Sequence, residues 1–517
     1  MRNQLFNWHG CLLGVLLVFM TFFVAACDDD DDAAEYAPFD ASKEVVVSDF
    51  LPKSGGVYQR LVIKGENFGN DKDIVSVTIG GQPAVIVNVI PNTIYCFVPE
   101  KAFSGEIVVT VGNSSTGIKQ AEAKERFQYE RKMVLSTVMG IRNAFGDDGW
   151  RPSSISEGAV PFERAIGFSC DGFLKFDPLY PDRMYIAYDG GDNPGIQLVD
   201  FTNKTVQVIL SNNWGTSRVR SVDFTLDGQY MIVAVDNAAQ GNTTPSVFML
   251  KRNYDGSFTN ASTRVMLAAY MQCNGASIHP INGELYFNSY ENGQVFRLDI
   301  QKYFDLQEAR SQWDPQSGEP EPAEWTGYRN DGAFEELFRI QDPQYEFQID
   351  IHPSGKYAYI VVINRSYILR TDYDEVNHTF MTPYVVAGKN YDHNSVQDKW
   401  RDGVGTDANL ARPYQGVFVK NPDYAGNEDE YDFYFCDNQN HCVRYLTPDG
   451  VVRTYCGRGS ASILDNNYWG TEDGDLREVA RFRDPTGITY DENTNTFYIL
   501  DTVGNKIRKI SMETEDE

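Results

Sequence analysis

Tryptophan, asparagine and aspartate side chains in polar segments are the groups of this sequence best suited to binding a ligand. Beyond Trp8, the chain holds six tryptophans: Trp150, Trp214, Trp313, Trp325, Trp400 and Trp469. Polar turns between apolar runs hold a second set: Asp189, Asn364, Arg365, Asn438, Asn440 and Asn505. Indole rings stack on the apolar faces of sugar rings, while carboxylates and carboxamides hydrogen-bond to sugar hydroxyls. The two sets predict a site for a neutral sugar, provided that the fold brings them to one face.

Groups that could perform catalysis are less well organised. His393 and His441 have no third ligand at the spacing that a zinc site requires. Asp-Gly segments such as Asp402-Gly403 could supply paired carboxylates for glycoside hydrolysis, although acidic residues are common in turns for structural reasons. We therefore assign no catalytic residue, metal or cofactor from the sequence. A lyase or hydrolase that uses Asp or His side chains stays as an alternative.

Cysteines are scattered through the chain. Apart from Cys11 and Cys27 there are six: Cys96, Cys170, Cys273, Cys436, Cys442 and Cys456. They form no C-x-x-C pair of the kind that binds metals, and their positions in apolar runs indicate small buried side chains. Cys436 and Cys442 flank one turn, so the pair could form a disulfide or stay reduced.

Length and charge limit the possible functions. A chain of 517 residues is longer than one ordinary domain, and 13% aromatic residues together with 43 glycines indicate an all-β protein with many turns. The formal net charge is −28 at pH 7. Nucleic acids, anionic lipid surfaces and polyanionic glycans require a basic footprint, so this charge argues against all three as partners. Neutral ligands remain open.

One structural unit occurs nearly twice near the C-terminus. Residues 433–457 and 497–510 each contain an apolar run that ends in Asp, a polar turn with Asn, and a strand that alternates basic and apolar residues. A hairpin that recurs after several tens of residues is typical of a propeller or a solenoid. With their lead-in segments at 402–413 and 480–488, both copies resemble the NHL repeat of β-propellers. That resemblance implies a fold and leaves the function open.

Four earlier strand pairs, which begin near Phe173, Val222, Ser277 and Asp350, bring the number of units to six. We therefore predict a six-bladed propeller of four-stranded sheets over residues 131–517. The last unit lacks an outer strand, and residues 133–140 have the pattern of that strand, so their pairing would close the ring.

The tryptophans have a common position on this division of the chain. All six fall in connectors between blades, and we expect them on one face of the propeller. Trp313 and Trp325 lie in the longest insertion, residues 301–344, and loops of this length are often functional. The alternative is that each indole packs its own connector onto the propeller.

A smaller all-β domain precedes the propeller at residues 44–130. Short alternating strands lie between Gly and Pro turns, which indicates a small sandwich. The strand order and the turn Gly65-Glu66-Asn67-Phe68-Gly69 resemble an IPT/TIG immunoglobulin-like domain. Such domains usually act as spacers.

The N-terminus has the pattern of a lipoprotein export signal. Arg2 precedes an apolar run at 11–23, and Val24-Ala25-Ala26-Cys27 resembles a bacterial lipobox with lipidation of Cys27. We expect a signal peptide at 1–26 and a flexible acidic tether at 27–43. The run Asp28–Asp32 resembles the surface-export signal of Bacteroidetes lipoproteins, which implies a lipid anchor in the outer membrane with the protein facing the cell exterior.

This combination of anchor, spacer and propeller resembles the surface glycan-binding proteins of Bacteroidetes polysaccharide-utilisation systems. The resemblance implies capture of a neutral polysaccharide or oligosaccharide for a TonB-dependent transporter and its lipoprotein lid. Besides the enzyme, a second alternative is a protein-interaction module of the transporter complex that touches no glycan.

Overall fold

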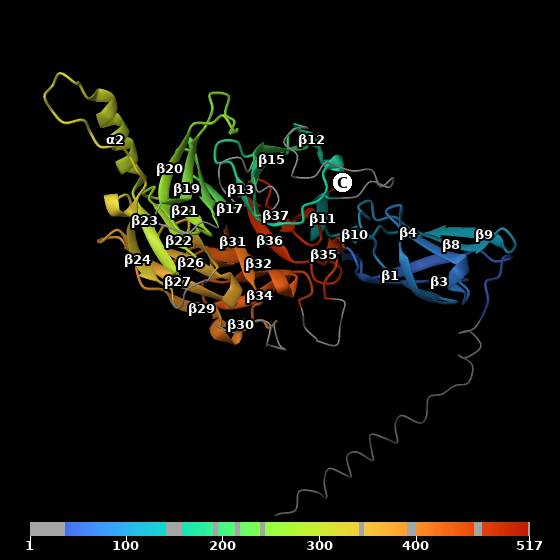
Figure 1. Cartoon of the computed structure of the whole chain (residues 1–517). Helices are drawn as coiled ribbons and strands as arrows, with labels where there is room; N and C mark the ends of the chain where they lie inside the picture. Colours follow the sequence, from blue (N-terminus) through green and yellow to red (C-terminus); the bar gives the residue numbers. More distant parts are fainter. Residues whose placement is uncertain are drawn as a thin grey trace, which may run out of the picture. The chain divides into compact units, whose positions relative to one another are not determined.

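The computed structural model describes residues 37–140, 158–189, 195–211, 218–237, 243–340, 346–389, 400–459 and 468–514 (Figure 1). The chain divides into two compact units, one comprising Met1–Lys132 with Glu513–Glu517 and the other Met133–Met512. Cys27, Trp150, Trp214 and His393 lie outside the described residues. Among the described residues no helix has the length and apolar character needed to cross a membrane.

The first unit is a sandwich of two four-stranded antiparallel sheets. One sheet has the order β1 (Val46–Leu51), β3 (Arg60–Glu66), β7 (Thr93–Phe97), β6 (Val85–Ile90). The other has the order β5 (Gln82–Pro83), β4 (Val75–Ile79), β8 (Ile107–Asn113), β9 (Gly117–Glu122), and a short parallel pair joins β10 (Gln128–Tyr129) to β2 (Ser54–Gly55). Alternate residues of both sheets, such as Ile63 and Val109, point inward and form one buried core.

The described part of the second unit contains six antiparallel sheets. From the innermost strand outward, the first sheet has the order β13 (Asp171–Phe176), β14 (Arg183–Asp189), β15 (Gly195–Asp200), β16 (Thr205–Leu210), β12 (Val160–Pro161). The second has the order β17 (Val219–Phe224), β18 (Tyr230–Val235), β19 (Thr244–Lys251), β20 (Arg264–Tyr270). The third has the order β21 (Ala276–Ile278), β22 (Leu285–Ser289), β23 (Gln294–Leu298), β24 (Glu335–Arg339). The fourth is β25 (Phe347–Ile351), β26 (Tyr357–Val362), β27 (Tyr367–Asp374), β29 (Tyr384–Gly388), with β28 (Thr379–Phe380) also on β27. The fifth has the order β31 (Pro413–Lys420), β32 (Tyr431–Asp437), β33 (Cys442–Leu446), β34 (Val451–Cys456), β30 (Gly403–Val404). The sixth has the order β36 (Pro485–Asp491), β37 (Thr496–Asp501), β38 (Lys506–Met512), β11 (Met133–Met139), β35 (Gly474–Asp475).

Helical segments are few among the described residues. The α-helix α2 (Ile300–Gln312) lies between β23 and β24, and the 3-10 turns are η1 (Lys72–Ile74), η2 (Phe162–Arg164), η3 (Arg329–Asp331), η4 (Ile363–Arg365), η5 (Gly405–Asp407), η6 (Pro422–Tyr424) and η7 (Asn438–Asn440).

The six innermost strands surround one axis. β13 contacts β17, which contacts β21, and the series continues through β25, β31 and β36 back to β13. Buried aromatic and branched side chains of neighbouring sheets, such as Tyr359 and Phe433, fill the space between them. This arrangement is a β-propeller, so the expectation of an all-β chain with an immunoglobulin-like domain and a propeller is confirmed. All six cysteines in the described residues are free thiols, including Cys436 and Cys442.

Each of the last two sheets contains a buried arginine between two aspartates, and one of these aspartates hydrogen-bonds to the outer strand of that sheet. In the fifth sheet Arg444 lies between Asp437 and Asp402, at 2.9 Å from each carboxylate, and Asp402 accepts hydrogen bonds from the backbone N–H and the hydroxyl of Thr454 on β34. In the sixth sheet Arg508 lies in the same way between Asp501 and Asp473.

Asp473 accepts its two hydrogen bonds from Thr137, both at 3.1 Å, and Thr137 belongs to β11. β11 therefore occupies, next to β38, the place that β34 occupies next to β33, although it comes from the start of the unit.

Replacement of Arg508 by Met should lower the free energy of unfolding by about 3–5 kcal/mol, because Asp501 would stay buried without its cation. Chemical denaturation of the unlipidated chain, Asp28 to Glu517, measures this effect. The matched control is Arg453→Met on the outer strand β34, whose side chain is exposed and should change stability little. Equal stability of the two variants would contradict the role given to Arg508.

Candidate functional site

A cavity of 250 Å³ lies at one mouth of the propeller channel. Its lining comes from the beginnings of innermost strands, the ends of second strands and the segments beside them: Asp171, Arg218, Arg220, Asp236, Gln272, Asn274, Tyr290, Glu346, Arg412 and Tyr414. In an antiparallel four-stranded sheet these positions share one face with the connectors between blades. The cavity is therefore on the face for which we predicted ligand binding, which we call the connector face.

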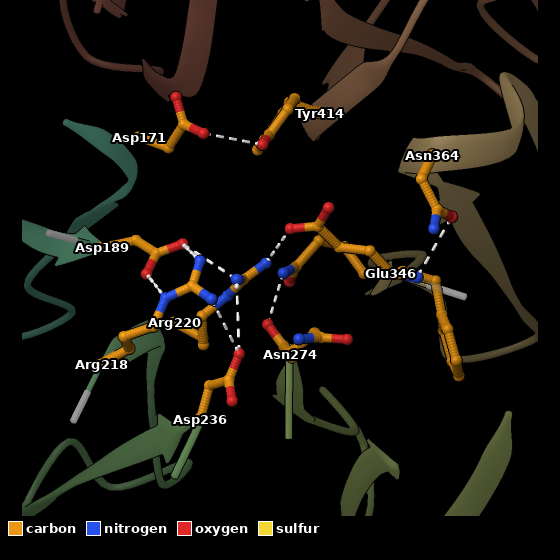
Figure 2. A network of polar contacts seen from close by, with 12 residues as sticks. Asp171, Asp189, Arg218, Arg220, Asp236, Asn274, Glu346, Asn364 and Tyr414 are labelled. Atoms are coloured by element: carbon orange, nitrogen blue, oxygen red, sulfur yellow. Dashed lines mark hydrogen bonds and ion pairs between the residues drawn. The ribbon is translucent and has the colours of Figure 1, made fainter. Parts of the chain in front are cut away.

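Arg218, Arg220 and Asp236 line one side of the cavity, and Asp189 contacts both arginines (Figure 2). Arg218 donates to both oxygens of Asp189, at 2.5 and 2.7 Å, and to Asp236 at 3.3 Å. Arg220 lies 2.9 Å from Asp189, and its side chain is 1% exposed, whereas that of Arg218 is 42% exposed. Burial raises the pKa of Asp236, which also accepts a hydrogen bond from Gln272 at 2.6 Å. Arg218 is thus the cation of this group that solvent reaches.

Glu346 faces the two aspartates from the fourth blade (Figure 2). One carboxylate oxygen pairs with Arg220, and the other lies 3.6 Å from Arg412. Burial acts to raise the pKa of Glu346, but the nearby guanidinium groups outweigh burial, so that this pKa is lowered. The backbone N–H of Glu346 donates to the carboxamide of Asn364 at 3.2 Å. The network therefore runs across the channel between blades that are distant in sequence.

Tyr414 closes the remaining side. Arg412 donates to its hydroxyl at 3.0 Å, and the hydroxyl donates to Asp171 at 2.9 Å. Burial raises the pKa of Tyr414 and of Asp171, so the phenol stays a hydrogen-bond donor. Around one cavity the chain thus places three guanidinium groups and four carboxyl groups.

Three atoms of these residues have no hydrogen-bond partner in the described part of the chain. They are Nε of Arg220, Nε of Arg412 and the carboxamide oxygen of Asn274, all of which are buried. A buried polar atom without a partner costs about 1–3 kcal/mol, so such atoms mark a place for a polar ligand or for solvent. Two are donors and one is an acceptor, as a ligand with several hydroxyl groups would need.

Metal binding finds no support in the described residues. They contain no group of three or more His, Cys, Asp or Glu side chains arranged to hold a metal ion. His441 lies on the connector face, where its Nδ1 accepts a hydrogen bond from the backbone N–H of Asp484 at 3.1 Å. Asp402 and Asp473, in the connectors considered above for glycosidase chemistry, are partners of Arg444 and Arg508.

The polar residues selected from the sequence separate into three kinds. Asp189 and Asn364 belong to the network, and Arg365 lies beside Asn364 in η4. Asn438 and Asn440 are buried, and their carboxamides donate to the Pro485 carbonyl and to Asp437. Asn505 is exposed and donates to the Val503 carbonyl of its own turn. The structure therefore brings Asp189 and Asn364 into the cavity network, while Asn438 and Asn440 support the fold.

Two of the tryptophans lie where we expected them. Trp400 is in the connector before β31 and donates from Nε1 to the Thr454 hydroxyl at 2.9 Å. Trp469 is in the connector before β36, is 41% exposed, and has the Arg483 guanidinium 4.7 Å from its ring centre. Both indoles belong to the connector face.

The predicted position of Trp313 and Trp325 was wrong. Both follow α2 and precede β24, so they lie between the third and fourth strands of one sheet and not in a connector between blades. Trp325 packs edge-on against Tyr303 and donates to the Met266 carbonyl at 3.2 Å, and Trp313 donates to the Glu319 carbonyl at 3.0 Å. The error arose because β24 comes after a long insertion and was not recognised as an outer strand.

Sequence reasoning missed the arginines and Glu346. It searched the turns between second and third strands, whereas Arg218, Arg220, Arg412 and Glu346 stand at or just before the first strand of a blade. One signal was present. Arg218 and Arg220 flank Val219 at the start of β17, so charge continues into a strand that should be buried.

Comparison with known proteins supports this architecture. The IPT/TIG domain family matches residues 46–129. No curated protein matches the chain. Several solved structures align with 92% of the chain, and three of them are at least 32% identical to it. A candidate phosphatase of Bacteroides thetaiotaomicron is 50% identical, with 99% of it covered and a TM-score of 0.78.

The other two are auxiliary nutrient binding proteins. One, from B. thetaiotaomicron, is 38% identical with a TM-score of 0.74, and the other, from B. ovatus, is 32% identical with a TM-score of 0.60. Each is covered completely. At these identities over nearly whole chains, this protein belongs to the family that includes the Bacteroides auxiliary nutrient binding proteins.

Proposed function

We propose that this protein captures a nutrient, a neutral oligosaccharide, on the connector face of its propeller. The observation that carries the proposal is the cavity beside Arg220, Arg412 and Asn274, in which two buried donors and one buried acceptor lack partners among the described residues. A sugar hydroxyl both donates and accepts, so one ring can satisfy groups of both kinds. A volume of 250 Å³ suits a single sugar unit of a longer chain, whose other units would lie along the face.

The charges of the cavity favour a neutral ligand over an anionic one. Each arginine already pairs with at least one carboxylate, and the lining holds as many carboxyl groups as guanidinium groups, three of each, with Asp189 as a further partner of Arg218 and Arg220. A phosphate ester would have to compete with these carboxylates for every cation. Although one relative is a candidate phosphatase, we therefore propose binding without catalysis.

The cellular location of the protein is part of the proposal. Lipidation at Cys27 and the acidic run after it would hold the propeller outside the outer membrane on a flexible tether. From there the bound oligosaccharide would pass to a TonB-dependent transporter and its lipoprotein lid. Two relatives are auxiliary nutrient binding proteins, and this supports the part of the proposal that concerns ligand capture.

The first prediction from the proposed function concerns Arg412. A panel of neutral polysaccharides and oligosaccharides is tested against the unlipidated chain by affinity electrophoresis and calorimetry, and we expect one glycan to bind with no product formed. Arg412→Met should then weaken binding about 10- to 100-fold, since a hydrogen bond from a charged donor contributes about 1.5–3 kcal/mol.

Arg339→Met is the matched control for this substitution. Arg339 pairs with Glu336 on the outer strand β24 and does not line the cavity, so glycan affinity should not change. A panel without any binder, or equal effects of the two substitutions, would contradict the proposed function.

The second prediction concerns the aromatic residues. Trp469→Ala should weaken glycan binding about 2- to 10-fold, because an exposed indole on the connector face can stack on a sugar ring for about 0.5–1.5 kcal/mol. Trp313→Ala should leave the affinity unchanged, because Trp313 lies in the insertion between β23 and β24. Calorimetry with the same glycan compares the two, and the reverse order of effects would place the ligand on the other face.

A further inference from the structure

A second cavity, of 430 Å³, lies at the opposite mouth of the propeller channel. Its lining comes from the far ends of five innermost strands and the turns that follow them, including Phe176, Phe224, Ile278, Ile351 and Phe418. Because the innermost strands run from the connector face to the other face, this cavity is separate from the site described above. None of its lining residues belongs to the first cavity.

Three charged side chains from three blades meet in this cavity. Lys175 of β13 pairs with Asp223 of β17 at 2.8 Å, and Asp350 of β25 also lines the space. The second oxygen of Asp223 accepts the backbone N–H of Ile278 at 2.8 Å, so Asp223 is fully engaged by the fold.

Asp350 differs from Asp223. Its Oδ2 is buried, no group of the described residues donates to it, and no cation of those residues lies within ion-pair distance of it. The cluster therefore holds two carboxyl groups and a single ammonium group, which is already paired with Asp223.

Apart from Thr225 and Ser277, the rest of the cavity wall is apolar. Pro178, Leu226, Pro280 and Pro353, in the turns between first and second strands, line it together with the aromatic residues named above. Leu226 is 56% exposed. A half-buried aspartate with one buried oxygen that has no partner, set in a largely apolar wall, suits a ligand with one cationic donor and a hydrocarbon body.

Other ligand classes fit less well. An anion would meet two carboxyl groups and a lysine that is already paired. A divalent cation would find no third acidic or histidine ligand among the described residues. We propose that this cavity binds a primary ammonium group on an apolar body, with Asp350 as its counter-ion.

The test uses n-pentylammonium as the probe and 1-pentanol as its neutral counterpart. Ligand-observed NMR titration of the unlipidated chain, Asp28 to Glu517, at pH 8.5 should show saturable binding of the amine at least tenfold tighter than that of the alcohol. Asp350→Asn keeps the shape of the side chain and removes its charge, so it should abolish this preference. It should not unfold the protein, because it removes a buried carboxylate that has no cation.

Asp432→Asn is the matched control. Asp432 of the propeller also has a buried oxygen without a partner among the described residues, but it does not line this cavity. Amine binding should therefore not change in this variant. Absence of saturable amine binding, equal binding of pentanol, or equal loss in both variants would overturn the proposal.

The pH dependence gives an independent measurement. Burial, with Asp223 acting in the same direction and Lys175 against it, raises the pKa of Asp350 to about 7. The carboxyl group is neutral below that pH and cannot pair with an ammonium group, so amine affinity should fall about tenfold or more between pH 8.5 and pH 5.5. In Asp350→Asn the residual affinity should be flat over this range. A wild-type profile as flat as that of the variant would overturn the assignment of Asp350.

Discussion

The unpaired inner edge of each blade is the constraint on which the rest of the propeller depends. An innermost strand has a hydrogen-bonded neighbour on one side only, so the N–H and C=O groups of its other edge point toward the channel. Polar side chains of adjacent blades bond to many of them. Gln415 accepts from Leu174 and Ile488 and donates to the Leu174 carbonyl, Ser221 accepts from Ala276, and Thr486 accepts from Gly172. Gly487 permits this closeness, since a Cβ there would lie 2.9 Å from the Gly172 carbonyl oxygen.

This constraint separates the polar groups that bond to strand edges from those that are left to bind a ligand. A serine, threonine or glutamine in the channel is explained once it bonds to the edge of a strand, and it then gives no information about a ligand. Arg220, Arg412, Asn274 and Asp350 are different, because each keeps a buried polar atom that neither edges nor side chains of the described residues satisfy. These atoms gather at the two mouths, where the strand edges end and the channel opens. Other buried atoms without a partner, such as Nε of Arg444 and Oδ1 of Asp432, line neither cavity, so only the combination of such an atom with a cavity distinguishes the two mouths.

How far the sequence predicts this structure depends on the range of the interactions involved. The alternating patterns, the recurring Asp and Asn of the last two units and the unpaired pattern at 133–140 are local or repeated signals, and they predicted the all-β class and the pairing partner of β38. Asn438 resembled a ligand-binding residue because its partner, the Pro485 carbonyl, is 47 positions away, whereas Asn440 bonds to Asp437 within its own turn. Arg218 and Glu346 are 128 positions apart, and nothing local shows that they share a cavity. The sequence therefore predicted the face and two members of the network, Asp189 and Asn364, but none of the residues that line the cavity.

The connector mouth combines high charge density with little net charge, and that combination shapes what it can recognise. Asp189 holds Arg218 and Arg220, and Glu346 holds Arg220 from the opposite side, so the guanidinium planes are fixed before any ligand arrives. Fixed donors reduce the entropy that a ligand must lose to form hydrogen bonds. Paired carboxylates meanwhile cancel the field that would attract anions, and a surface of net charge −28 repels them further. If the ligand is the neutral sugar that we propose, such a site would discriminate by the direction of hydrogen bonds.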